Sequence, residues 1–201
     1  VSIIGAVSPP GGDFSEPVTQ NTLRVVKNFW ALDADLAEKR HFPSINWDDS
    51  YSGYSDKLAD YFKDEVEDDW PQKIQRARDL LQKDGDLQET VQLVGKDALP
   101  DRERLTLEIA TMVKKFFLQQ NAFHPVDEYS EPEKTFDILE LILNWGEQAH
   151  EALETGALVE DIIALDSKNR ISELATSENY KEVKNEVSNQ MDEEFEEVVD
   201  Q

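Results

Sequence analysis

The sequence predicts a mainly α protein, in which a C-terminal helical bundle follows a small α/β segment. Apolar residues recur at helical spacing from about residue 54 to residue 198. Before that stretch, two apolar runs rich in β-branched or aromatic residues resemble short strands, and five of the eight prolines precede residue 72. We therefore expect the α/β segment over residues 1–45 and the helical bundle over residues 46–201.

The N-terminal part is predicted to hold two strands and little helix. The run "SIIGAV" (2–7) has the pattern of a buried strand and ends at the loop "SPPGGD". One or two helical turns are expected in "EPVTQNTLRVV" (16–26), and a second strand in "VVKNFWAL" (25–32). The stretch "DADLAEKRH" (33–41) is expected to be a short helical or irregular link.

Two helices are expected next, and a break is expected between them. Asp69-Trp70-Pro71 predicts a helix start, because an N-cap residue is followed by an early proline. This helix should reach about Lys83, where "DGD" (84–86) is expected to end it. Apolar residues at helical spacing also occur before and after this helix. Those before it are Tyr54, Leu58, Tyr61 and Phe62; those after it are Leu87, Val91 and Val94, and this second series ends at Gly95.

The rest of the chain is predicted to be a series of helices. A strong helix should run to about Gln120, and an irregular connection, "NAFHPVDEYSEP", should follow it. A long helix should stop near Gly156, short helices are expected at about 158–165 and 168–176, and Ser177 is the expected cap of the last helix. The stripes are Leu105, Ile109, Met112, Val113 and Phe116; Phe136, Leu139, Ile142 and Leu143; and Tyr180, Val183, Val187, Met191, Phe195 and Val198.

The composition is strongly acidic. Asp and Glu number 44 against 20 Lys and Arg, which gives a net charge of −24. A chain of this charge repels nucleic acid, so we expect no nucleic-acid partner. A solvated acidic surface is the simplest interpretation, and adaptation to a salty cytoplasm, where counterions screen the repulsion, is a further hypothesis.

Several kinds of site are absent from the sequence. Without cysteine there is no disulfide, thiolate metal site or cysteine nucleophile. His41, His124 and His150 lie far apart and match no zinc-binding spacing, so we predict no metal site. The motifs GxxxxGK[ST], GxGxxG and GxSxG do not occur, and no apolar run approaches the ~18–20 residues that span a membrane.

Two irregular segments carry aromatic residues, "HFPSINW" with Phe42 and "LQQNAFHPVD" with Phe123. Aromatic rings in loops beside a rigid scaffold can stack on a flat ligand such as a nucleotide base. The alternative is that both rings fill the hydrophobic core at a boundary between elements. Spacing alone favours that alternative.

The run "GAVSPPGGDFSEPVTQNTLRVVKNFWALDADLAEKRHFPSINWDDSYS" resembles the catalytic A subunit of archaeal-type and vacuolar-type rotary ATPases. The resemblance continues through "LQETVQLVGKDALPDRERLTLE", "FLQQNAFHPVDEY" and "PEKTF", and it fades toward the C-terminus. It implies that residues 1–45 are the edge of a P-loop nucleotide-binding domain. Because the chain has no initiator Met and opens on a strand-like run, we expect a C-terminal fragment of a longer subunit.

The resemblance implies that the fragment holds no catalytic residue, because the groups that act on the phosphates lie upstream in such subunits. ATP or ADP with Mg would bind the full subunit, and the fragment alone should be inactive and bind no nucleotide tightly. By resemblance, Phe42 and Phe123 would pack on opposite sides of adenine. The residues expected to line the same pocket are Gln119, Gln120 and Ala122.

A second implied site is the segment "VGKDALPDRE" (94–103), which resembles the helix-turn-helix tip that contacts the central rotor in related F-type enzymes. Their tip is more acidic, whereas Lys96, Pro100 and Arg102 interrupt the acidic run here. An ordinary capped turn is the alternative. The expected contact residues, called the tip below, are Lys96, Asp97, Ala98, Leu99, Pro100 and Asp101.

The resemblance also implies partners and a location. Non-catalytic B subunits would alternate with catalytic ones in an A3B3 ring, and central stalk subunits would contact the tip. A membrane sector that translocates ions would be an indirect partner of this chain. The complex would lie at the cytoplasmic face of the cell membrane as a peripheral part. The alternative function is an acidic helical interaction module, a non-catalytic paralogue that binds no nucleotide.

Overall fold

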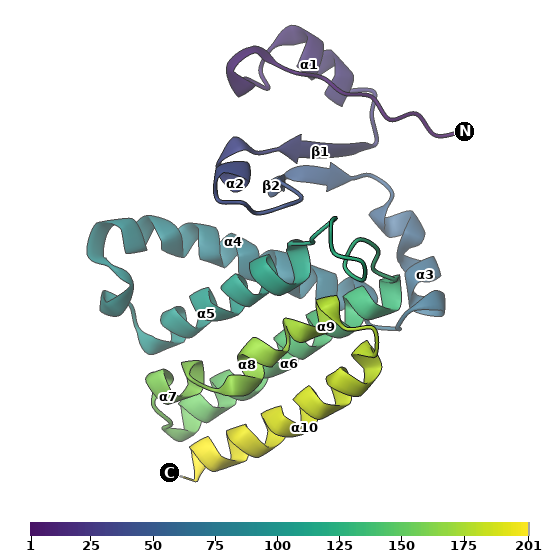
Figure 1. The fold of residues 1–201 in the computed structure, drawn as a ribbon. Helices are drawn as coiled ribbons and strands as arrows, with labels where there is room; N and C mark the ends of the chain where they lie inside the picture. Colours follow the sequence, from purple (N-terminus) through teal and green to yellow (C-terminus); the bar gives the residue numbers. More distant parts are fainter. Residues whose placement is uncertain (201) are drawn as a thin grey trace.

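The computed structural model in Figure 1 describes residues 1–200, so the last residue of the predicted bundle, 201, lies outside the described residues. The fold is mainly helical, with one two-stranded sheet near the N-terminus. In Figure 1, α1 and the sheet lie above the layers of bundle helices, and the C-terminal helix forms the opposite side. The predicted fold class is confirmed.

The elements follow one another in this order. The strands are β1 (Asn28–Leu32) and β2 (Ile45–Ser52). The helices are α1 (Pro17–Leu23), α2 (Ala34–Glu38), α3 (Ser55–Glu65), α4 (Trp70–Val94), α5 (Asp101–Met112), α6 (Pro132–Thr155), α7 (Val159–Ile163), α8 (Asp166–Arg170), α9 (Glu173–Thr176) and α10 (Tyr180–Val199). Short 3-10 turns occur at η1 (Pro10–Gly12) and η2 (Lys96–Ala98), and a π-helix, η3 (Val113–Leu118), continues α5.

The small sheet is an antiparallel hairpin-like pair. Leu32 lies opposite Ile45, and Ala31, which is buried, lies opposite Asn46. β1 confirms the second predicted strand, whereas β2 was assigned to no element. The predicted domain boundary between residues 45 and 46 falls at the start of β2 and stays a prediction.

The strand predicted at residues 2–7 is wrong, because residues 1–9 have no regular secondary structure. Ile3 and Ile4 are largely exposed. A strand forms only when a neighbouring strand satisfies its backbone groups. Within residues 1–200, β1 and β2 pair with each other and the apolar run has no strand beside it.

Helix α6 forms the centre of the bundle. Its side chains Leu139, Ile142 and Trp145 are fully buried, and they join one cluster with apolar residues of α4, α5 and α10. Gly156 ends α6 in the left-handed conformation (φ 109°), as the sequence predicts. The irregular connection predicted after residue 120 is confirmed.

The break predicted at "DGD" (84–86) is wrong, since α4 runs unbroken through it. Asp84 is buried, and its Oδ2 accepts a hydrogen bond from Lys114 Nζ of η3 at 2.8 Å. Gly85 costs a helix interior roughly 1 kcal/mol relative to alanine, which packing of α4 along α5 offsets. The predicted Ser177 cap is also wrong, because Ser177 ends α9 in an extended conformation and Asn179 precedes α10.

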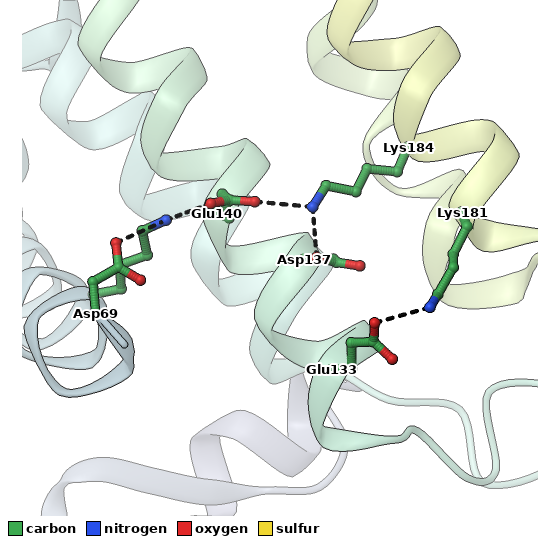
Figure 2. Close-up of polar contacts among 7 residues, drawn as sticks. Asp69, Glu133, Asp137, Glu140, Lys181 and Lys184 are labelled. Atoms are coloured by element: carbon green, nitrogen blue, oxygen red, sulfur yellow. Dashed lines mark hydrogen bonds and ion pairs between the residues drawn. The ribbon is translucent and has the colours of Figure 1, made fainter. Parts of the chain in front are cut away.

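Ion pairs join three helices at one end of the bundle (Figure 2). Lys73 of α4 is paired with Asp69 and with Glu140 of α6. Lys184 of α10 bridges Glu140 at 2.9 Å and Asp137 at 2.6 Å. Burial opposes ionisation of Glu140, but hydrogen bonds from both lysines lower the pKa of its carboxyl group.

Candidate functional site

The two aromatic segments that the sequence singled out meet in the structure. The backbone N–H of Gln120 donates a hydrogen bond to the carbonyl oxygen of Phe42, with the N and O atoms 2.8 Å apart. This bond ties the chain just after η3 to the chain between α2 and β2. Phe42 and the segment 119–123 are therefore held side by side, although they lie far apart in the sequence.

The exposure of the rings excludes the alternative of core filling. Phe123 is 98% exposed and Phe42 is 51% exposed, so neither ring packs into the core. Gln119 and Ala122 are also exposed, and Gln120 is half-buried. The structure thus gathers the predicted pocket residues in one region and leaves two aromatic faces uncovered.

The segment that carries Phe123 is fixed by its own hydrogen bonds. Gln120 Nε2 donates to the carbonyl oxygen of Asp127 at 2.7 Å, and the N–H of Asn121 donates to Asp127 Oδ2 at 2.6 Å. The N–H of Phe123 donates to Asn121 Oδ1 at 3.0 Å. Sequence reasoning missed Asp127, because nothing in a loop sequence marks one carboxylate as buried.

The other side of the region begins with a strained residue. Arg40 has a φ of 58°, a left-handed conformation that glycine adopts at far lower cost. It follows α2 in a turn closed by bonds from Arg40 N–H to Ala37 and from His41 N–H to Leu36. Sequence reasoning missed Arg40 because its residue type carries no signal for this conformation.

His41 joins this turn to the bundle. Its ring lies 5.8 Å from that of Trp47, edge to face, and Trp47 packs against the bundle core. Burial, and then the nearby charge of Lys114, lower the pKa of His41 below its usual value. The folded state therefore favours the neutral form of this imidazole more than the unfolded state does.

The predicted tip forms a tight turn between α4 and α5. Gly95 takes a φ of 85°, which only glycine adopts readily, and η2 follows it. Leu99 is buried and anchors the turn, while the other five predicted contact residues are exposed. Leu93 and Val94 at the end of α4 are 85% and 57% exposed, and sequence reasoning missed Leu93.

Ion pairs hold the tip against the rest of the bundle. Lys96 reaches Glu108 of α5 at 3.3 Å, and Glu108 also pairs with Lys168 of α8 at 2.9 Å. Burial opposes ionisation of Glu108, but bonds and charges from these two lysines lower its pKa. Arg102 reaches Glu154 of α6 at 3.0 Å across an exposed surface, which contributes little.

Two surface grooves lie away from the predicted residues. One, of about 650 Å³, lies between the C-terminal parts of α6 and α10, and another, of about 290 Å³, lies beside their N-terminal parts. Across residues 1–200 no group of three or more His, Asp or Glu side chains is arranged to hold a metal ion. No helix in that range is both long enough and apolar enough to cross a membrane.

Comparison with protein families gives two matches. The family described as "C-terminal domain of V and A type ATP synthase" matches residues 59–163. The family described as "ATP synthase alpha/beta family, nucleotide-binding domain" matches residues 1–52. The two matches follow one another along the chain and are separated by residues 53–58, which come directly after β2.

Comparison with individual proteins gives A subunits of A-type ATP synthases. The chain is 59% identical over 182 residues to that of Haloquadratum walsbyi, covering 90% of this chain and 31% of the relative. It is 55% identical over 195 residues to that of Methanosarcina barkeri, covering 97% of this chain and 34% of the relative. The chain thus spans about a third of the length of the curated relatives it matches.

A solved structure shares the fold. The "unique ATP synthase subunit NeqB" from Nanoarcheaum equitans aligns with a TM-score of 0.58 at 24% identity, covering 69% of this chain and 34% of that one. At this identity the likeness concerns the fold alone.

Proposed function

The chain belongs to the V and A type ATP synthase family, where its relatives are A subunits, and on this premise we propose that it supplies the adenine pocket and the rotor-contacting tip of a rotary ATP synthase. The complete subunit would bind ATP or ADP with Mg, and the synthesis or hydrolysis of ATP would be coupled to rotation. The proposed division is the edge of a nucleotide-binding domain (1–45) and a helical bundle (46–201). The family matches to residues 1–52 and 59–163 support it.

The main support for the proposed adenine pocket is the hydrogen bond from the Gln120 N–H to the carbonyl oxygen of Phe42. It joins two segments whose rings are exposed, where a core-filling role would have buried them. Large exposed aromatic rings beside a fixed backbone are suited to stack on a flat base. Base–aromatic stacking contributes about 1–3 kcal/mol per base, as measured by alanine substitution.

The test is nucleotide affinity in the complete A subunit, assembled with its partner subunits. Phe42→Ala and Phe123→Ala should each weaken equilibrium binding of MgATP by about 5- to 150-fold, which corresponds to the loss of one stacking contact. Thermal unfolding should stay cooperative in both variants, because neither ring packs in the core.

Tyr61→Ala is the matched control, since Tyr61 is an aromatic residue of α3 with 56% exposure and lies outside the proposed pocket. It should leave MgATP affinity unchanged. Unchanged affinity in both Phe variants would contradict the pocket and favour the alternative function, an acidic interaction module that binds no nucleotide.

The tip is proposed as the contact with a central stalk. Its exposed residues adjoin Leu93 and Val94, which leave apolar surface uncovered at the end of α4. Exposed apolar residues with a charged rim are typical of protein-binding sites. Lys96 pairs with Glu108 of α5, which also pairs with Lys168 of α8, so that a push on the tip would move these helices together.

Cross-linking tests the tip. Residues 1–201 contain no cysteine, so Ala98→Cys introduces the sole thiol of this chain at an exposed position of η2. In the assembled complex, we expect a disulfide or bifunctional cross-link from position 98 to a stalk subunit. Asp56→Cys on α3, at the opposite end of the long helices in Figure 1, should give none. Failure at position 98 and at Asp97→Cys would contradict the contact.

The remaining partners follow from the same proposal. We place the chain in an A subunit that alternates with non-catalytic B subunits in an A3B3 ring, above a membrane sector that translocates ions, at the cytoplasmic face of the cell membrane. The names of the curated relatives support a multisubunit complex. Rotation requires an element with two positions that nucleotide biases, and the bundle with its tip is the element proposed here.

A further inference from the structure

We propose that Asp127 is a positioning residue for nucleotide binding: it holds segment 119–123 in the conformation that projects Phe123 toward the base. This inference rests on the proposed function, because it assumes that Phe123 stacks on adenine. It adds a residue that touches no ligand and acts through the backbone of its neighbours.

Asp127 is the one buried residue of a loop (119–131) whose other residues are exposed or half-buried. Its exposed fraction is 8%, while Phe123 in the same loop is 98% exposed. A buried carboxylate is costly unless hydrogen bonds compensate the lost water. Here the carboxylate Oδ2 accepts the N–H of Asn121 at 2.6 Å, a charge-assisted bond of the stronger kind.

The main chain of Asp127 holds the same segment a second time. Its carbonyl oxygen accepts Gln120 Nε2 at 2.7 Å, while the N–H of Gln120 is donated to Phe42. Gln120 is therefore bonded through its side chain to Asp127 and through its backbone to the other half of the pocket. Gln120 thus holds the two halves of the proposed pocket together, while the ring of Phe123 stays exposed.

A turn closes the loop between Asn121 and Asp127. His124 Nδ1 accepts the N–H of Val126 at 3.2 Å and that of Asp127 at 3.3 Å. The N–H of His124 is donated to the carbonyl oxygen of Asn121 at 3.0 Å. Asp127 thus accepts a hydrogen bond at its carboxylate from Asn121 and donates one from its N–H to His124, and both bonds stabilise the turn.

The bundle supplies a counter-charge for Asp127. Lys134, in the first turn of α6, is 5% exposed and donates from Nζ to the carbonyl oxygen of Ala175 at 2.7 Å. Burial lowers the pKa of Lys134, and the negative charge of Asp127 opposes that shift, which indicates that the two groups interact.

Three variants separate positioning from general charge effects. Asp127→Ala removes the acceptor, and Asp127→Asn keeps the shape and leaves a neutral acceptor for the Asn121 N–H. Glu128→Ala is the matched control, because it removes an exposed carboxylate of the adjacent residue. Two readouts are used in the complete subunit within its complex: hydrogen exchange of the segment containing Asn121, and equilibrium binding of MgATP.

Asp127→Ala should speed exchange at Asn121 and weaken MgATP binding by about tenfold or more, since a bond to a charged group is lost. Asp127→Asn should show a smaller change in both readouts, and Glu128→Ala should show neither. If Asp127→Ala does not assemble, the comparison of Asp127→Asn with Glu128→Ala decides the question.

Unchanged exchange in the Asp127 variants overturns the positioning role. Faster exchange with unchanged MgATP affinity also overturns the inference when Phe123→Ala weakens binding, because the loop then does not set the affinity. If neither Asp127→Ala nor Phe123→Ala changes the affinity, the failure belongs to the proposed pocket, and the exchange result alone still reports whether Asp127 holds the loop.

Discussion

His150 is a residue whose charge the fold disfavours. It is partly buried on α6, and its Nδ1 has no hydrogen-bond partner among residues 1–200. Burial lowers the pKa of His150, Arg102 and Lys83 lower it further, and Glu154 partly opposes them. The folded state therefore binds the proton less readily than the unfolded state does.

This depressed pKa predicts a loss of stability in mild acid. As pH falls through the ordinary histidine value of 6.5, the unfolded state takes up a proton first, so the free energy of unfolding should decrease below that pH. Urea unfolding at pH 7.5 and pH 5.5 measures the decrease. His150→Gln should reduce it, and the remainder should reflect His41, whose pKa is also lowered by burial. A decrease of the same size in His150→Gln would contradict the assignment.

Residue by residue, the sequence indicated what composition can signal. Phe42 and Phe123 stood out because aromatic rings in irregular segments are unusual there, and the family resemblance gave them a role. Arg40 and Asp127 could not be found in this way. The φ of Arg40 and the burial of Asp127 depend on how distant segments close around them, and neither leaves a mark on residue type.

At the scale of elements, α5 and α6 approach each other at Gly146. A Cβ built there would lie 3.0 Å from Cδ1 and 3.2 Å from Cγ2 of Ile109, closer than ordinary contact. Alanine is intrinsically better than glycine in a helix by about 1 kcal/mol. Overpacking a buried contact costs about 1–3 kcal/mol, so we expect packing to outweigh propensity at this position.

Gly146→Ala should therefore lower the free energy of unfolding by about 1 kcal/mol, measured by urea denaturation. Ile109→Val removes the Cδ1 atom and should cost about 0.5–1.5 kcal/mol alone, but much less in the Gly146→Ala background. Gly85→Ala is the matched control: a Cβ there meets nothing within 4 Å, so it should stabilise α4 by up to about 1 kcal/mol. A stabilising Gly146→Ala would mean that Ile109 turns aside freely.

Element by element, periodicity predicted the helices well and the strands poorly. The long helices follow apolar stripes that the packed bundle confirms, as with Leu139 and Ile142 on α6. The glycine of "DGD" suggested a break because the buried pairing of Asp84 with Lys114 cannot be read from the sequence. β2 was missed because its residues are mostly half-buried or exposed, without a strong apolar alternation.

The molecule as a whole carries a net charge of −24, which the ion pairs do not cancel. Pairs such as Lys184 with Glu140 and Asp137 draw a few carboxylates into the bundle (Figure 2). Many others remain on the surface, among them Glu193, Glu196 and Glu197, which are exposed side chains of α10. Like charges at this density repel one another and favour expanded states over the compact one.

Salt should relieve this repulsion, because the screening length falls from about 10 Å at 0.1 M to about 3 Å at 1 M ionic strength. We expect the midpoint of thermal unfolding to rise between low salt and 1 M KCl, by about 2–4 °C for each kcal/mol of repulsion removed. Exposed ion pairs weaken under the same conditions, but each contributes at most about 1 kcal/mol.

A charge variant separates screening from general effects of the salt. Replacing Glu193, Glu196 and Glu197 by glutamine removes three exposed charges that have no ion-pair partner among residues 1–200. This variant should unfold at a higher temperature than the parent in low salt, and its further rise in 1 M KCl should be smaller. A parent midpoint that stays flat or falls with KCl would contradict the salt-adaptation hypothesis. If KCl raised the midpoint of thermal unfolding equally in the parent and the variant, the rise would be a general effect of the salt. Screening should give a smaller rise in the variant, because it has fewer charges to screen.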